Sequence, residues 1–246
     1  MVSPTLALII VLVLYVILYA IGRNKNIPYL ADIFIFIYFL FAFINIEGSA
    51  TLATFYLFAI IFVIAFEVAQ SKFTVNSQQI KEIGGFKLKS KLPLIGIGLG
   101  FGILLIMRVL QTSVEGSIIG VPSLAITSPA FGVSTITLLG IVENRLFFTI
   151  YELLKANTQL LLAIPFIGGL LGIFNLILPV VLTAILFAIF HLTAYSLSVS
   201  TMIFAALVMV IWLLSYILTK SDLPANLAHG MWNGTIALGR VLGVAV

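Results

Sequence analysis

The chain has only two histidines, and both lie inside long apolar stretches of its sequence. Phe187 and His191 are four residues apart, as are His229 and Asn233, so each pair falls on one face of a helix. Glu143 adds a carboxylate inside an earlier apolar stretch. Polar side chains at such positions are expensive in lipid and are functional candidates by default.

A glutamate and a histidine can together hold and deprotonate a water molecule, because an apolar site disfavours the charged carboxylate and makes it a better base. A second histidine and an asparagine amide can donate hydrogen bonds to the oxyanion of a tetrahedral intermediate. The set therefore indicates hydrolysis. Each histidine taken singly also fits a packing or hydrogen-bonding role, and only the combination with a buried glutamate favours catalysis.

Three short motifs resemble those of the CAAX-protease and bacteriocin-processing family of intramembrane proteases. That family has EExxxR on one helix, followed by FxxxH and then HxxxN or HxxxD. Here the corresponding segments are ENRLFF from Glu143, FAIFH ending at His191, and HGMWN from His229 to Asn233. The flanking residues 223–233, LPANLAHGMWN, also resemble the last motif. The resemblance covers roughly residues 133–246.

The resemblance implies an endopeptidase that acts within the membrane on a protein or peptide substrate; a prenylated C-terminal peptide is the best-known target of the family. Glu143 and His191 would position and activate the water, and His229 and Asn233 would stabilise the oxyanion. A zinc ion held by Glu143, His191 and His229 is possible. The sequence has no HExxH motif, and the same residues suffice without metal, so we do not expect a tightly bound metal ion.

The first motif departs from the family pattern at two positions. Asn144 stands where the family has a second glutamate, and Phe148 stands where it has an arginine. Losing one partner of a buried ion pair costs about 3–5 kcal/mol, whereas losing both can be nearly neutral. We therefore interpret the departure as removal of a structural pair. Arg145 lies two residues along the helix from Glu143 and should point to another face.

Two other functions remain open. The altered first motif is compatible with a catalytically inactive family member that acts as a membrane scaffold or binding protein. A transporter or channel could use Glu143, Arg145 and Glu152 as a polar path, although the sequence shows no inverted repeat of the kind found in many transporters.

The composition predicts the elements that must position these residues. Apolar residues make up 62% of the chain and charged residues 8%, compared with about 25% charged in soluble domains. A spanning helix needs roughly 20 apolar residues, and the continuous runs favour helices over transmembrane strands. We predict an all-α, polytopic transmembrane bundle of about eight spans, at residues 4–22, 28–46, 50–69, 93–110, 133–154, 177–196, 199–218 and 223–243.

Two further features concern the ends and the packing of these spans. The first span lacks a basic leader region and a cleavage site, so we expect a retained helix rather than a signal peptide. In the fourth span, Gly96, Gly98, Gly100 and Gly102 would let another helix backbone approach closely. The chain has no cysteines, which excludes disulfides and thiol chemistry.

The basic residues predict an orientation in the cell membrane. Nine of the twelve fall on one side if 156–176 is an interfacial or re-entrant hairpin, and a ninth helix there is the alternative. The nine are Arg23, Lys25, five lysines in a polar loop at 70–92, Lys155 and Lys220. That side should be cytoplasmic, with both termini outside. Short basic loops suit a lipid surface rather than nucleic acid.

We divide the chain into N-terminal helices at 1–110 and a catalytic membrane domain at 133–246.

The predicted spans place the two histidines at different depths. With straight helices and a core of about 30 Å, His191 and His229 would lie about 13 Å apart along the membrane normal. That separation is too large for shared catalysis. We therefore expect the sixth span to continue beyond Tyr195 to about Ser200, so that all four candidate residues line one cavity.

Overall fold

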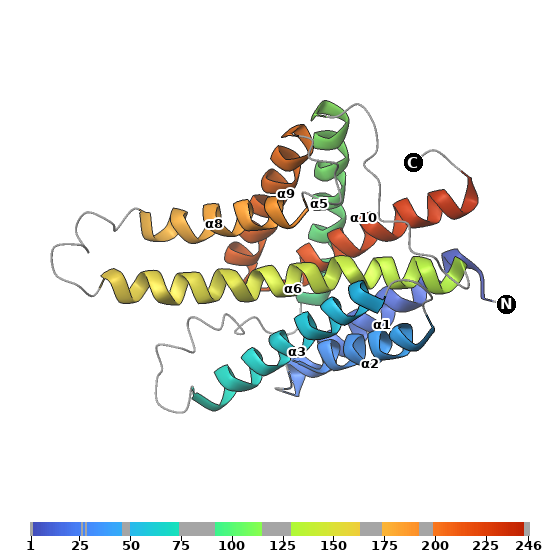
Figure 1. Ribbon diagram of the computed structural model, residues 1–246, viewed down its shortest axis with the longest axis horizontal. Helices are drawn as coiled ribbons and strands as arrows, with labels where there is room; N and C mark the ends of the chain where they lie inside the picture. The colour runs from blue at the N-terminus through green and yellow to red at the C-terminus, as the bar shows by residue number, and fades with distance from the viewer. Residues whose placement is uncertain are drawn as a thin grey trace.

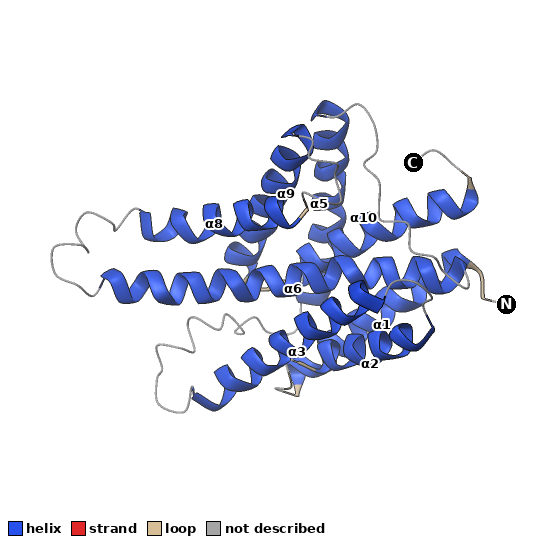
Figure 2. Ribbon diagram, in the orientation of Figure 1, coloured by secondary structure: helices blue, strands red, loops and turns tan. Residues whose placement is uncertain are grey.

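The computed structural model describes residues 2–25, 27, 29–45, 50–73, 92–114, 129–162, 174–191 and 199–243. All regular structure within these ranges is helical (Figure 2), which confirms the all-α prediction for this part of the chain. The helices are α1 (Pro4–Asn24), α2 (Leu30–Asn45), α3 (Ala50–Phe73), α5 (Leu92–Val114), α6 (Pro129–Leu162), α8 (Phe174–Phe190), α9 (Val199–Thr219) and α10 (Leu223–Leu242).

Three of these helices contain segments that are long and apolar enough to cross a membrane: Pro4–Gly22, Pro129–Thr158 and Val199–Thr219. Four shorter apolar segments lie in α2, α3, α5 and α8. The molecule is therefore a helical membrane protein, but eight crossings are not confirmed. Helix α10 carries Asn226, His229 and Asn233 and buries 14 of its 20 residues against other helices, so it is an interior helix rather than a lipid-facing one.

Helix α6 is the central element of the fold (Figure 1). Its 34 residues correspond to about 51 Å at 1.5 Å per residue, and it packs against α1, α2, α3, α8 and α10. One apolar cluster joins α1, α2 and α3 to α6 and α10, and a second joins α5, α8 and α9 to the same two helices. Helices α6 and α10 therefore belong to both halves of the core. The predicted division at 1–110 and 133–246 stays a prediction.

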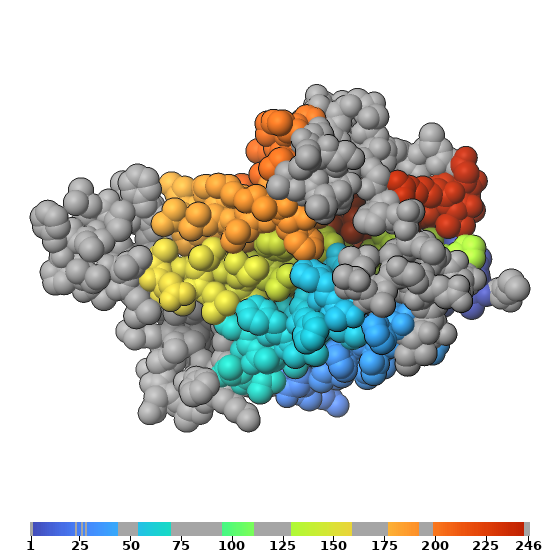
Figure 3. Space-filling model, in the orientation of Figure 1, coloured from blue at the N-terminus to red at the C-terminus, as the bar shows by residue number. Residues whose placement is uncertain are grey.

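The outward faces of the helices carry large apolar side chains, as contact with lipid requires. On the face seen in Figure 3, α8, α6 and α3 form adjacent bands. Ile185 and Ile189 of α8 are exposed on the surface, as are Phe58 and Ile61 of α3. In water, a surface with so many exposed apolar residues would favour aggregation.

Two of the four glycines of α5 provide close packing against α10. A Cβ atom on Gly96 would lie 3.0 Å from Leu223 Cδ2, and one on Gly100 would lie 3.1 Å from Leu227 Cβ. No atom of the described residues lies within 4 Å of the corresponding positions at Gly98 and Gly102. Gly96 and Gly100, four residues apart, therefore lie on one face of α5 against α10. The predicted close approach of another helix is seen at this pair and not at Gly98 and Gly102.

Several predicted boundaries need correction. Helix α3 continues to Phe73, so residues 70–73 of the expected loop are helical, and 74–91 lie outside the described residues. Helix α8 ends at Phe190 and His191 lies in the turn that follows it, while 192–198 lie outside the described residues, so the predicted continuation to about Ser200 stays a prediction. The stretch 156–176 contributes helical residues to the end of α6 and the start of α8. Those two ends lie at the same end of the molecule (Figure 1). A non-crossing connection at 163–173 stays a prediction.

Candidate functional site

Glu143 on α6 lies between the two histidines. Its Oε2 atom is 3.4 Å from His191 Nε2, at the end of α8, and 3.5 Å from His229 Nε2, on α10. All three side chains are buried, with 4–7% of their residue surface exposed. The structure thus places three of the four predicted site residues around a single carboxylate oxygen, although they come from three helices and span 86 positions from 143 to 229. A shared cavity stays a prediction.

Each imidazole is oriented by a hydrogen bond through its other nitrogen. His191 Nδ1 lies 2.8 Å from the backbone carbonyl of Phe187, and His229 Nδ1 lies 3.0 Å from Asn144 Oδ1. Both partners are oxygens that can only accept, so each Nδ1 carries a hydrogen. In a neutral imidazole the lone pair is then on Nε2, which faces Glu143. Glu143 Oε2 and the two Nε2 atoms are then all hydrogen-bond acceptors that face one another. This arrangement favours a proton, or a molecule that donates protons, between them.

Aromatic rings enclose the two imidazoles. The Phe187 ring centroid lies 4.2 Å from that of His191, and Trp212 of α9 stacks on His229 at 4.3 Å with an angle of 26° between the planes. Phe187 also meets Trp212 edge to face. The FxxxH spacing therefore serves two purposes, because Phe187 anchors the ring of His191 through its carbonyl and covers it with its side chain. These walls exclude bulk water and strengthen the electrostatic interactions inside.

Tyr56 of α3 completes the surroundings of the carboxylate. Its hydroxyl donates a hydrogen bond to Glu143 Oε1, the oxygen that does not face the histidines. Tyr56 is buried, stacks on Phe39 at 5.8 Å and meets Phe55 edge to face. The sequence analysis missed this residue. A hydroxyl within an apolar span was its only signal, and the chain has eight tyrosines.

Asn144 takes part in the site, contrary to the interpretation that its position lost only a structural pair. It is fully buried, and its Oδ1 atom accepts the hydrogen bond from His229 Nδ1. Phe148, at the other altered position, stacks on Tyr216 at 4.9 Å. The two altered positions therefore differ in kind: Asn144 orients a histidine, while Phe148 packs in the apolar core.

Asn233 lies on the same face of α10 as His229, as its spacing predicts. A Cβ atom added to Gly140 would lie 2.9 Å from Asn233 Nδ2 and 2.9 Å from His229 Cδ2. Gly140 is three residues before Glu143, on the same face of α6. The absence of a side chain at Gly140 therefore lets α10 approach α6 closely enough for His229 to reach Glu143. Asn233 is half-buried beside this contact, one turn of α6 away from the carboxylate.

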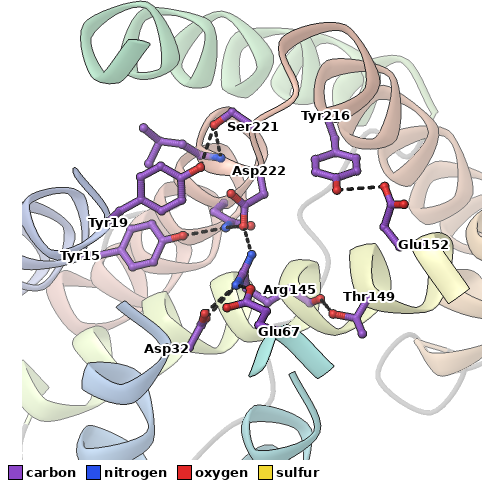
Figure 4. Close-up of polar contacts among 12 residues, drawn as sticks. Tyr15, Tyr19, Asp32, Glu67, Arg145, Thr149, Glu152, Tyr216, Ser221 and Asp222 are labelled. Atoms are coloured by element: carbon purple, nitrogen blue, oxygen red, sulfur yellow. Dashed lines mark hydrogen bonds and ion pairs between the residues drawn. The ribbon is translucent and has the colours of Figure 1, made fainter. Parts of the chain in front are cut away.

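Arg145 points away from the histidines, as predicted, into a group of acidic residues (Figure 4). Its guanidinium binds both carboxylate oxygens of Asp32 of α2, at 2.9 and 2.6 Å, and also contacts Glu67 of α3 and Asp222, which precedes α10. Asn226 donates to Asp222 at 3.0 Å. This network joins α2, α3 and the start of α10 to α6 two residues from Glu143. It thereby holds α3, and with it Tyr56, against the site.

Glu152 is separate from both groups. It accepts a hydrogen bond from Tyr216 at 3.0 Å and lies 3.8 Å from Lys155 Nζ. Glu143, Arg145 and Glu152 thus have three different sets of partners. Within the described part of the chain, these contacts do not connect the three residues into one polar path.

Glu143, His191 and His229 are the side chains that the sequence suggested as ligands of a metal ion. Within the described part of the chain, no group of three or more histidine, cysteine, aspartate or glutamate side chains is arranged to hold one. Glu143 approaches each histidine separately, but the three do not form such a group.

The fold and the site together define a membrane-embedded helical protein with a buried glutamate between two histidines. The family model for type II CAAX prenyl endopeptidase Rce1-like proteins matches residues 160–235. This match confirms the family resemblance that the motifs predicted, over that part of the chain. No curated protein and no solved structure gives a significant match.

The matched segment contains His191, His229 and Asn233 and begins 17 residues after Glu143. The matched segment therefore includes the second and third motifs. The assignment of Glu143 depends instead on its position between the histidines. The same is true of Tyr56 and Asn144, which also lie outside the match.

Proposed function

We propose that this protein is an intramembrane endopeptidase of the CAAX-protease type, which hydrolyses a peptide bond with a water activated by Glu143 and His191. The observation that carries the proposal is the position of one carboxylate oxygen, Glu143 Oε2, within 3.5 Å of the Nε2 atoms of His191 and His229. Titratable groups that meet at one buried point are candidates for proton transfer in a reaction.

In the proposed reaction, a water molecule donates its hydrogens to Glu143 Oε2 and His191 Nε2. Tyr56 already occupies Oε1, so the carboxylate presents one defined oxygen to the water. As the water oxygen bonds to the peptide carbonyl carbon, its proton passes to the Glu143–His191 pair. A positioned base of this kind contributes about 10²- to 10⁴-fold to a rate.

The tetrahedral intermediate needs hydrogen-bond donors for its oxyanion. His229 can donate from Nε2 when a proton shared with Glu143 resides on the imidazole, and Asn233 can donate from its amide. The indole of Trp212 stacks on His229 and holds the plane of its imidazole. When the C–N bond breaks, the leaving nitrogen takes the proton that the Glu143–His191 pair accepted. The base is then regenerated.

We propose a prenylated C-terminal peptide as the substrate class. We also propose that this protein is a multi-pass protein of the cell membrane. The description of the matching family names a prenyl endopeptidase, and the exposed apolar faces of α3 and α8 indicate contact with lipid. A lipid-modified peptide would approach such a site along the bilayer. The mechanism requires no metal ion.

The test is cleavage of a farnesylated peptide by the purified protein in liposomes, with the fragments identified by mass spectrometry. We expect cleavage by the unaltered chain and none above background by Glu143→Ala or His191→Ala. Both variants should unfold in detergent at nearly the same temperature as the unaltered chain, which shows that they are folded. Near-normal turnover by either variant would refute the mechanism. Failure of the unaltered chain to cleave would favour a scaffold or binding protein.

A further inference from the structure

Four buried side-chain atoms in the described residues lack a hydrogen-bond partner, and two of them belong to residues that contact His229. These are Asn144 Nδ2 and Trp212 Nε1. Both are nitrogen donors, whereas the other two, Glu67 Oε2 and Asn226 Oδ1, are oxygens that belong to the Arg145 network or border it. An unmade buried hydrogen bond is costly, and in a native structure it needs an explanation.

Asn144 has its acceptor satisfied and its donor unused. Oδ1 accepts from His229 Nδ1 at 3.0 Å, which fixes the plane of the amide. The residue is 0% exposed, so bulk water cannot satisfy Nδ2. Asn144 adjoins Glu143 in sequence and contacts His229 in space. Its unused Nδ2 donor therefore belongs to a side chain that directly contacts one of the proposed catalytic histidines.

The missing partner must be an acceptor, because an amide nitrogen only donates. A peptide offers such an acceptor at every residue in its carbonyl oxygens. We propose that Asn144 is a substrate-binding residue, which orients His229 through Oδ1 and donates from Nδ2 to a peptide carbonyl oxygen of the substrate. This inference rests on the proposed peptidase function and adds a contact that the family match, at residues 160–235, does not cover.

Asparagine suits this double role better than an acidic residue would. A carboxylate at position 144 could accept from His229 but would have no hydrogen for a carbonyl oxygen. It would also place a second negative charge next to Glu143, where like charges repel. Asn144→Asp therefore removes the proposed donor while keeping the acceptor and nearly the same shape.

The experiment measures binding rather than turnover, in a Glu143→Gln background that prevents cleavage. The probe is a fluorophore-labelled farnesylated peptide ending in Cys-aliphatic-aliphatic-Ser, and Kd is measured by fluorescence anisotropy in detergent micelles. A second set of peptides replaces one peptide bond at a time by a trans-alkene isostere, which removes that carbonyl. Comparing Glu143→Gln with Glu143→Gln/Asn144→Asp over this set forms a double-mutant cycle.

We expect one position in the peptide at which the isostere weakens binding to Glu143→Gln by about fivefold, as for a single neutral hydrogen bond. At that position the isostere should have no effect on Glu143→Gln/Asn144→Asp. The exposed Asn157 on the same helix provides the control, because Glu143→Gln/Asn157→Asp should respond to the isostere as Glu143→Gln does.

Two results would overturn the inference in distinguishable ways. Binding of the peptide without coupling at any position would reject the role of Asn144 and leave the proposed function standing. No binding of the peptide by Glu143→Gln would reject both. Thermal unfolding of each variant identifies any loss of binding that comes from misfolding.

Discussion

Replacing Tyr56 by phenylalanine tests whether the N-terminal helices take part in the chemistry. The change removes only the hydroxyl that donates to Glu143 Oε1, because the phenylalanine ring can keep its stack on Phe39 at 5.8 Å and its edge contact with Phe55 at 5.4 Å. Tyr56 and Glu143 are 4% and 7% exposed, so bulk water does not replace the lost donor. The carboxylate would then be free to turn.

The size of the effect follows from two opposing terms. A hydrogen bond to a charged group contributes about 1.5–3 kcal/mol, which corresponds to about ten- to 150-fold in rate if it is all used to position the base. Losing the donor also makes the carboxylate more basic, which offsets part of this loss. We therefore expect kcat to fall by about tenfold, near the lower end. KM should change by less than about twofold, because Tyr56 contacts the base rather than the peptide.

The assay is steady-state cleavage of the farnesylated peptide in liposomes. Tyr38→Phe is the matched control, since Tyr38 of α2 also hydrogen-bonds to α6, at Ser134, nine residues before Glu143. Nine residues correspond to about 14 Å along the helix, so this change should leave kcat within about twofold. An unchanged or higher kcat in Tyr56→Phe would refute the positioning role of α3.

Three further predictions concern the surroundings of the site. Arg145→Met leaves three acidic side chains without their cation and should destabilise the protein by about 3–5 kcal/mol in detergent unfolding, whereas Arg240→Met at an exposed position should change stability little. Gly100→Ala places a Cβ atom 3.1 Å from α10 and should lower the free energy of unfolding by about 1–3 kcal/mol. Gly98→Ala, with no atom of the described residues within 4 Å, should be neutral or stabilising. Equal effects of the two changes would contradict the packing assigned to α5. Prolonged dialysis against a strong zinc chelator should leave peptide cleavage within about twofold, and loss of activity that added zinc restores would show a metal requirement.

The elements of the fold were largely predictable from the sequence because lipid imposes a simple rule on it. Continuous apolar runs predicted each described helix to within a few residues at most ends, and the polar residues that interrupt them identified the site. The predictions differed most from the structure where the length of a helix does not match the length of its apolar run. Helix α6 continues to Leu162, well past the predicted end at 154, and α10 is too polar to count as a membrane span although it is central to the fold.

Parallel, straight helices would put the two histidines at different depths, and the sequence therefore predicted a departure from that geometry. That geometry placed His191 and His229 about 13 Å apart, yet both reach the same oxygen of Glu143. The predicted continuation of the sixth span falls mostly on 192–198, which lie outside the described residues. Helices α8, α9 and α10 run in clearly different directions (Figure 1), and depth along one axis therefore does not determine the distances between them.

The site itself was predictable only in part. Spacing and motif type predicted Glu143, His191, His229 and Asn233 as site residues, because side chains four residues apart share a helix face. The contacts that orient these groups come from residues without such a pattern. Tyr56 is 87 positions before Glu143, and Asn144 departs from the family motif, so neither role follows from local sequence. Such pairings depend on how helices pack, which periodicity alone does not specify.

The central claim is that Glu143 and His191 act as one unit on a single water, and a double-mutant cycle in peptide cleavage tests it most directly. Rates of Glu143→Gln, His191→Gln and the double variant would be measured under single-turnover conditions in liposomes. Groups that act as a unit show strongly non-additive losses, so the double variant should cleave about as slowly as the slower single variant. If the two losses multiply, each residue acts independently, and the shared activation of water by Glu143 and His191 is contradicted.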